Sequence, residues 1–242
     1  MEDIEKFLQI VKNGKNIVFF GGAGVSTESG IPDFRGTGGL YHQKYAYPPE
    51  EILSDTFFWS KTDEFFRFYR DKMLFHGAKP NVTHKTLALL EQKGKLKAVV
   101  TQNIDDLHEQ AGSKNVLHLH GSVYGNTCVR CGKRYGIEAV ENSAGVPYCD
   151  CGAFIKPDVV LYGEPLPQEV VAAAVDAISH ADVLIVGGTS LTVYPAAMYV
   201  DYFRGEHLIL INKESTPLDG TAELTFHCKL GEVFQKLFES IS

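Results

Sequence analysis

Residues 22–36 decide the fold of this chain and read Gly22-Ala23-Gly24-Val25-Ser26-Thr27-Glu28-Ser29-Gly30-Ile31-Pro32-Asp33-Phe34-Arg35-Gly36. They follow residues 16–20, an apolar run that is short enough to be a buried strand. Small residues directly after a strand let the backbone approach a ligand closely, and the backbone N–H groups of such a turn can hold a pyrophosphate. An acid, an aromatic ring and a guanidinium come next, which indicates that chemistry takes place beside the phosphates.

The composition limits the class of protein. The 242 residues are 44% hydrophobic, which suits one large α/β domain or a large domain with a small insert. The formal net charge is −7 and no basic run of five or more residues occurs, so no direct nucleic-acid ligand is expected. The acidic N-terminal stretch is not a secretory signal, and no apolar run reaches the roughly 18 residues that span a bilayer. We expect a cytoplasmic monomer that does not bind membranes.

Short apolar runs alternate with helical patterns along the chain. The runs are apolar on both faces, which is typical of a parallel sheet covered by helices on both sides. The sequence therefore predicts an α/β fold with a doubly wound parallel sheet. The expected strands are 16–20, 97–101, 116–120, 159–162, 183–186 and 208–211; the expected helices are 4–12, 61–75, 83–93, 167–180 and 194–204; and 37–60 reads as a long ordered loop.

Polar residues follow the expected strands at their carboxyl ends, where a doubly wound sheet binds its ligand. Taken singly, Asn103 and Asp105 could be helix caps and His120 could be a core histidine. Together, their placements favour one crevice in which amides, a carboxylate and an imidazole converge. His84, His108 and His118 are interpreted as structural, and Asn81 as a helix N-cap. The polar ends are 21–24, 101–105, 120–121, 187–190 and 212–214.

Four of the five cysteines lie within 24 residues, as Cys128-x-x-Cys131 and Cys149-x-Cys151 with 17 residues between the pairs. Two close thiolate pairs can complete a tetrahedral Zn²⁺ site, and four sulfur ligands leave no open position for water, so the ion would be structural. The alternative is four buried cysteines without a metal. Cys228 is either a core thiol or a nucleotide contact.

Together these residues closely resemble the sirtuins, the NAD-dependent protein deacylases, and most of all the compact bacterial and archaeal members. The resemblance extends from residue 7 to about residue 235. Its most specific parts are residues 22–36, 101–105, 120–121, the paired cysteines, 156–164 and 188–191. The resemblance implies a Rossmann-like large domain (1–36, 77–120 and 157–242). It also implies a small discontinuous domain, made of a helical module (37–76) and a zinc module (121–156), with NAD and the acyl-lysine meeting between the two domains.

The resemblance also assigns roles to individual residues. It implies that Phe34 shields the sugar, that Asn103, Ile104 and Asp105 line a nicotinamide pocket, and that Arg35 contacts the phosphate and ribose region. The implied NAD-binding set is Gly22, Ala23, Gly24, Thr27, Asp33, Phe34, Arg35, Gln102, Asn103, Ile104, Asp105, His120, Gly188, Thr189, Ser190, Asn212, Glu214 and Cys228. Val159, Gly163 and Glu164 would pair with the backbone of the substrate by β-augmentation.

The implied reaction uses His120 as the general base and Asn103 as a second catalytic residue. The acyl oxygen attacks C1′ of the ribose, His120 removes a proton from a ribose hydroxyl, and nicotinamide, O-acetyl-ADP-ribose and free lysine are released. Desuccinylating sirtuins carry Tyr-x-x-Arg at positions that correspond here to Phe66 and Tyr69. We therefore predict that acetyl is preferred over succinyl, because a phenol cannot form the bidentate bond of a guanidinium.

Several other functions compete with this interpretation. A nicotinamide dehydrogenase would need the glycine run to lead directly into a helix and an acid about 20 residues later. A zinc-ribbon binding module without turnover would leave His120 and the strand-end amides unexplained. Removal of longer acyl chains and mono-ADP-ribosyl transfer would use the same NAD pocket as deacetylation.

Overall fold

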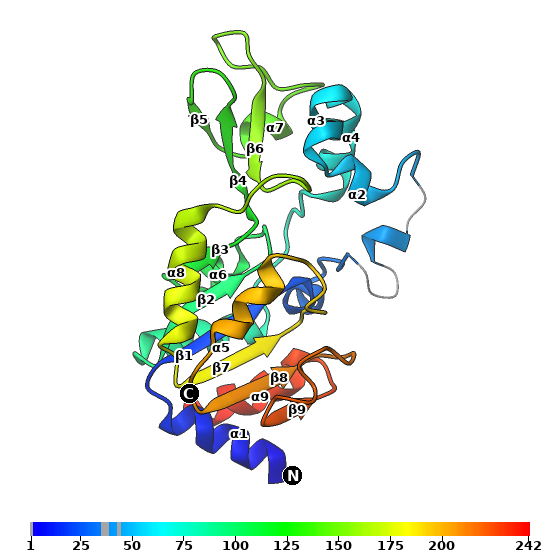
Figure 1. Cartoon of the computed structure of the whole chain (residues 1–242). Helices are drawn as coiled ribbons and strands as arrows, with labels where there is room; N and C mark the ends of the chain where they lie inside the picture. The colour runs from blue at the N-terminus through cyan, green and yellow to red at the C-terminus, as the bar shows by residue number, and fades with distance from the viewer. Residues whose placement is uncertain (1, 35–38, 43–44) are drawn as a thin grey trace.

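The computed structural model describes residues 2–34, 39–42 and 45–242, so Arg35 lies outside the described residues. Within these ranges, six parallel strands form one sheet in the order β3-β2-β1-β7-β8-β9 (Figure 1). Numbered by appearance within this sheet, the order is 3-2-1-4-5-6, that of dinucleotide-binding proteins. The strands are β1 (Ile17–Gly21), β2 (Leu96–Thr101), β3 (Val116–His118), β7 (Val183–Gly187), β8 (His207–Ile211) and β9 (Leu224–Phe226).

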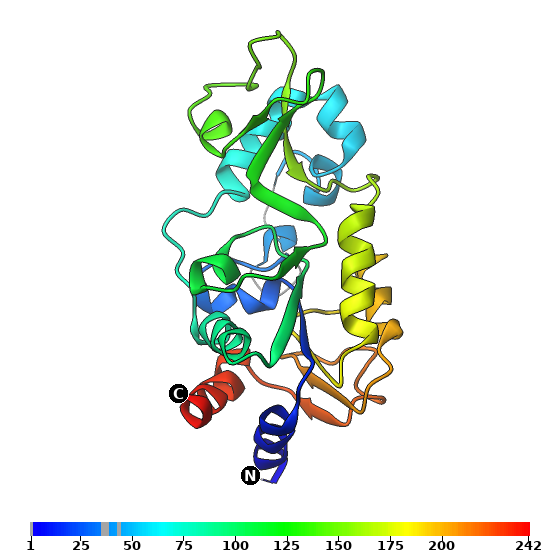
Figure 2. The same cartoon turned by 90° about the vertical axis from the view of Figure 1, so that its left-hand side faces the viewer.

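Both faces of the sheet are buried, as the apolar runs predicted. Phe19 and Ile185 point to a core under α1 (Glu2–Asn13), α5 (Val82–Gln92) and α9 (Leu230–Ile241). Phe20 and Val186 point to the opposite core, under α8 (Gln168–Ser179) and the 3₁₀ helix η4 (Ala196–Tyr202). Figure 2 shows the sheet between these two layers. Each fully buried side chain of this kind stabilises the fold by about 1.5–3 kcal/mol, which fixes the strand ends rigidly.

A smaller lobe lies beyond one end of the large sheet (Figure 1). Its helical part is α2 (Pro49–Ile52), α3 (Asp55–Ser60) and α4 (Thr62–Lys72). Its other part is an antiparallel sheet in the order β5-β4-β6, from β5 (Arg134–Tyr135), β4 (Gly121–Cys128) and β6 (Ile155–Val159), with α7 (Glu138–Glu141). The two parts share one apolar core, and Arg70 of α4 joins them by donating to the carbonyl oxygen of Val140 at 2.8 Å.

The structure corrects three expectations. Residues 159–162 are not a strand of the parallel sheet, because β6 ends at Val159 and pairs with β4 in the small antiparallel sheet. Residues 37–60 are not one loop, because α2 and α3 form there, as does the 3₁₀ helix η3 (Leu40–His42). β3 ends at His118, two residues before His120, and the short edge strand β9 was not foreseen.

Other local predictions are confirmed. The side chain of Asn81 accepts a hydrogen bond from the amide of Thr83 at 2.9 Å and caps α5. His84 lies in α5 and His108 in the short helix α6 (Leu107–Ala111), and both rings are buried against each other. In the described part of the chain, no helix combines the length and the apolar character needed to cross a membrane.

Candidate functional site

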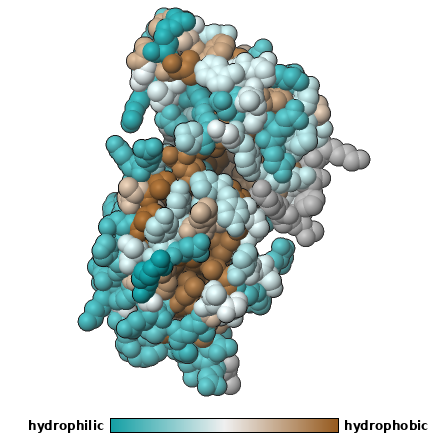
Figure 3. All heavy atoms as spheres, viewed as in Figure 1, coloured by the Kyte–Doolittle hydropathy of each residue, from teal (hydrophilic) through white to brown (hydrophobic). Residues whose placement is uncertain are grey.

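The site begins at the switch point of the large sheet, between the neighbouring strands β1 and β7. The chain leaves β1 towards β2 on one side and β7 towards β8 on the other, so the loops after β1 and β7 border a crevice at the carboxyl edge. The amide of Gly22 donates to the carbonyl oxygen of Gly187 at 3.3 Å, which holds these two loops together. A cavity of about 730 Å³ opens here, and Figure 3 shows an apolar hollow between the two lobes.

The cavity gathers residues that lie far apart in the sequence, including the loops after β1, β2 and β7. Asp105 is not in its wall but lines a smaller cavity beside it. Arg35 lies outside the described residues. The remaining predicted residues line the large cavity: Gly22, Ala23, Gly24, Thr27, Asp33, Phe34, Gln102, Asn103, Ile104, His120, Val159, Gly163, Glu164, Gly188, Thr189, Ser190, Asn212, Glu214 and Cys228. These residues, which are far apart in the sequence, therefore lie around one cavity.

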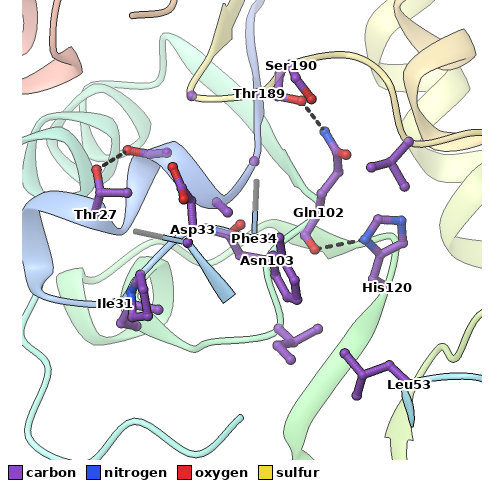
Figure 4. Close-up of a pocket in the computed structure, with 18 of the residues that line it drawn as sticks. Thr27, Ile31, Asp33, Phe34, Leu53, Gln102, Asn103, His120, Thr189 and Ser190 are labelled. Atoms are coloured by element: carbon purple, nitrogen blue, oxygen red, sulfur yellow. Dashed lines mark hydrogen bonds between the residues drawn. The ribbon is translucent and has the colours of Figure 1, made fainter. Parts of the chain in front are cut away.

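Gln102 organises the centre of this cavity (Figure 4). Its side-chain amide donates to Thr189 Oγ1 at 3.0 Å, and its backbone carbonyl oxygen lies 2.9 Å from Nδ1 of His120. A carbonyl only accepts, so Nδ1 of His120 carries the proton, and the neutral ring has its lone pair on Nε2. Burial lowers the pKa of His120 below its ordinary value of 6.5, while the bond to Gln102 opposes this effect. The imidazole is therefore held neutral, with a basic nitrogen.

A second network surrounds Asn103 at the end of β2. Asn103 is buried, its side-chain amide donates to Ser26 Oγ at 3.1 Å, and Ser26 donates to Asp105 Oδ2 at 2.8 Å. Burial raises the pKa of Asp105, which hydrogen bonds from Ser26 and the amide of Leu107 partly oppose. The smaller cavity, about 50 Å³, lies here and shares Ala23, Phe34, Asn103 and Ile104 with the large one. Ser26 lies in the run 22–36 but was given no role by sequence reasoning.

The lobe-facing side of the cavity contains a tight turn. Glu164 accepts hydrogen bonds from the amide of Leu161 at 2.8 Å and from Nζ of Lys156 at 3.0 Å, so its carboxylate is used within the turn. Tyr162, next along the chain, shares a hydrogen bond of 2.6 Å between its hydroxyl and that of Tyr41. The wall also includes Val193, Tyr194 and Pro195, which sequence reasoning missed because they carry no charge or motif of their own.

The two positions invoked for acyl selectivity lie elsewhere. Phe66 and Tyr69 are both fully buried in the core of the small lobe, and neither lines the large cavity. The apolar wall on this side comes instead from Leu53, Met73 and Leu161. A direct role for residues 66 and 69 as an acyl-contacting pair is therefore not supported by the geometry.

The four paired cysteines form a separate site at the far end of the small lobe. Their sulfur atoms all lie within 4.8 Å of one another, with Cys128 and Cys151 at 3.5 Å and Cys131 and Cys149 at 3.6 Å. A tetrahedron with Zn–S bonds of about 2.3 Å places its sulfurs about 3.8 Å apart, so the thiols fit a zinc ion. Four sulfur ligands complete the coordination, which makes the site structural.

The fold and the site together define a dinucleotide-binding protein of the doubly wound class that carries a four-cysteine metal module. The sequence pattern of the Sir2 family matches residues 22–195. An NAD-dependent protein deacetylase of Clostridium acetobutylicum is 54% identical over 239 residues, which cover 97% of this chain and 98% of that protein. A second NAD-dependent protein deacetylase, from Cutibacterium acnes, is 45% identical and covers 98% of each chain.

Solved structures agree with these sequence relatives. A Sir2–p53 peptide–NAD⁺ complex is 40% identical, with a TM-score of 0.87 over 98% of this chain and 97% of that one. A Sir2 variant with deacetylated p53 peptide and 3′-O-acetyl-ADP-ribose is 41% identical, with a TM-score of 0.90 over 99% of this chain and 100% of that one. This chain belongs to the Sir2 family.

Proposed function

We propose that this chain is an NAD-dependent protein lysine deacetylase. It consumes NAD, an acetyl-lysine protein and water, and gives nicotinamide, O-acetyl-ADP-ribose and free lysine. The relatives that carry this name cover nearly the whole chain, and similar solved Sir2 structures carry NAD⁺, a p53 peptide and 3′-O-acetyl-ADP-ribose in their names. The proposal divides the chain into an NAD-binding large domain and a small domain of helical and zinc modules, as the sequence analysis sets out.

One observation carries the proposal: the basic nitrogen of His120 in the switch-point cavity. The bond from Nδ1 to Gln102 fixes the ring, and within the described residues Nε2 has no hydrogen-bond partner. A neutral imidazole in a buried cavity can accept a proton from a ribose hydroxyl at neutral pH, because its pKa lies below 6.5. We assign His120 as the general base.

NAD would lie along the carboxyl edge of the large sheet. The amides of the loop after β1 and the hydroxyls of Thr189 and Ser190 face the dinucleotide, with Asn212 and Glu214 on the adenosine side. The Asn103–Ser26–Asp105 network supplies amide and carboxyl groups that match the carboxamide of nicotinamide. Phe34 lines both cavities and would exclude water from the reacting sugar.

The acetyl-lysine peptide would enter from the side of Gly163 and Glu164. The carboxylate of Glu164 is used inside its own turn, so we propose that this segment recognises the peptide through its backbone, and Val193 and Tyr194 line the same cavity. The zinc module would act at a distance by holding β4 and β6, and β6 leads directly into this segment.

Mass spectrometry of the products tests the proposal. The protein is mixed with NAD and an acetyl-lysine peptide, and the expected products are nicotinamide, O-acetyl-ADP-ribose and unmodified peptide in equal amounts. A peptide or protein that gains ADP-ribose while the acetyl group stays in place would point to mono-ADP-ribosyl transfer. Faster turnover of a long-chain acyl peptide would point to a broader deacylase. Absence of nicotinamide release with every peptide would refute the proposal.

A further inference from the structure

His118, interpreted from the sequence as a structural histidine, bonds to two oxygen atoms at once. Its Nδ1 lies 3.2 Å from the backbone carbonyl oxygen of Asn103, and its Nε2 lies 2.6 Å from Oε1 of Glu109. The ring is largely buried, with 17% of the side chain exposed, while Glu109 lies nearer the surface. His118 thus connects α6 to the backbone of the residue that we place against nicotinamide.

Both partners of the ring are hydrogen-bond acceptors. A neutral imidazole has one N–H group, so it could satisfy only one of them, and its other nitrogen would face an oxygen lone pair. The imidazolium form has two N–H groups and satisfies both. The pKa of His118 reflects this geometry: burial alone would lower it, but the hydrogen bond and charge of Glu109, the bond to Asn103 and the charge of Asp105 together raise it above 6.5.

The other titratable groups around the ring do not reverse this balance. Burial, and to a smaller extent the neighbouring His84 and His118, lower the pKa of His108 on α6 well below 6.5, so its ring is neutral. His84, on α5, has a pKa of about 4, mainly because it is buried. The cluster therefore holds two neutral histidines and one positive charge, and His118 is where two carboxylates, Glu109 and Asp105, attract that charge.

We propose that His118, in its imidazolium form, is a positioning residue for Asn103. The inference rests on the proposed function, because it concerns the same nicotinamide pocket. Three hydrogen bonds hold Asn103. Its backbone N–H donates to Thr101 Oγ1 at 3.0 Å, its side-chain amide donates to Ser26 Oγ, and its backbone carbonyl oxygen accepts from His118. Deprotonation of His118 leaves the ring with one N–H group. The 2.6 Å bond to the carboxylate of Glu109 is shorter and charge-assisted, so it keeps this group, and the 3.2 Å bond to the carbonyl of Asn103 is lost.

The expected consequence is a loss of activity on the alkaline side. The pKa of His118 is raised above 6.5 in the folded chain. The bond from His118 to the carbonyl of Asn103 is therefore fully formed below about pH 6.5 and is lost as the pH rises through the pKa of the folded chain. A single hydrogen bond to a backbone carbonyl accounts for a change of about threefold to tenfold. We expect kcat/KM for deacetylation to fall by this factor on the alkaline limb, while the binding of adenosine diphosphate ribose stays constant.

Nuclear magnetic resonance tests the inference without any assay of activity. The ¹⁵N shifts of the His118 ring should report two protonated nitrogens at pH 6.5 and a midpoint above it, and the amide signals of Asn103 should move with the same midpoint. Glu109→Gln should lower that midpoint. A neutral His118 ring at pH 6.5, or Asn103 signals that ignore its titration, would overturn the proposal even if deacetylation is confirmed.

Kinetics supply the second readout, with variants matched to the claim. Glu109→Gln should shift the alkaline limb of kcat/KM to lower pH, and His118→Gln should abolish that limb. His207→Gln is the matched control, since His207 lies 2.7 Å from Glu223 in a similar pair outside the cavity wall. An alkaline limb that is unchanged in Glu109→Gln, in a protein whose ring titration has shifted, would overturn the positioning role. A complete lack of deacetylation in the wild type would instead refute the proposed function and leave the resonance test intact.

Discussion

The amide of Gly24 donates a hydrogen bond to the carbonyl oxygen of Gly188 at 2.8 Å, so the loops after β1 and β7 touch through their backbones. A Cβ atom on Gly24 would lie 2.7 Å from Cα of Gly188, and Gly188 itself has a φ of +62°, which favours glycine. The glycines are therefore required by contact between two loops, in addition to any contact with a dinucleotide.

Gly24→Ala should consequently disturb both stability and NAD binding. The clash is with backbone, which cannot swing aside as a flexible side chain would, so we expect the free energy of unfolding to fall by about 1–3 kcal/mol. The affinity for NAD, measured by calorimetry, should fall as the loop shifts. Gly220→Ala is the matched control, because a Cβ there meets no atom within 4 Å. Equal melting temperatures for the two variants would contradict the backbone-contact argument.

His120→Tyr should separate binding from chemistry. A phenol has no nitrogen that can accept a proton at neutral pH, so deacetylation should fall by at least about a hundredfold. NAD binding should persist, because the other residues of the cavity wall are unchanged. Equilibrium binding of NAD and single-turnover deacetylation measure the two effects. Full turnover in this variant would remove His120 from the role of general base.

The acid side of the pH profile should also report on His120. Burial lowers the pKa of His120 below 6.5, so the ring stays neutral, and able to accept a proton, down to a pH below that value. We therefore expect kcat/KM to remain high at pH 6.5 and to decline only at lower pH, where the ring becomes protonated. An acid limb centred above 6.5 would show that another group controls this side of the profile.

Removal of one cysteine of the four-cysteine site should cost the small lobe its zinc ion and lower the stability of the protein. Cys149→Ser removes one of four sulfur ligands, and the small core around it contains only Cys128, Cys149, Ala153 and Ile155 as buried members among the described residues. We expect loss of bound zinc, measured by atomic absorption, and a lower melting temperature. Cys228→Ser is the matched control, since this cysteine lies in the NAD cavity wall and should retain full zinc. Unchanged zinc content in Cys149→Ser would contradict the four-thiolate site.

Much of this structure could be predicted because its signals are local. The apolar runs around Phe19 and Ile185 identified central strands, and the glycines after them marked the ligand edge. Residues 159–162 were misassigned because an apolar run does not reveal whether its partner strand is parallel. α2 and α3 were missed because helices of four and six residues show no clear periodicity. The setting of His118 depends on a carboxylate of α6 and a carbonyl after β2, and only the tertiary fold brings these together.

Acyl selectivity remains a prediction, now with a different structural basis. Phe66 and Tyr69 are core residues, and the apolar wall of the cavity on this side comes from Leu53, Met73 and Leu161. A succinyl carboxylate placed against this wall would lose its water without gaining a cationic partner from these residues, which is unfavourable. We expect kcat/KM for a succinyl-lysine peptide to be at least about tenfold lower than for the acetyl peptide. A butyryl peptide of the same sequence is the control, because it has the same number of acyl carbons and no charge. Butyryl and succinyl peptides that are both slow would indicate a limit of length, whereas a succinyl rate equal to the acetyl rate would contradict the prediction.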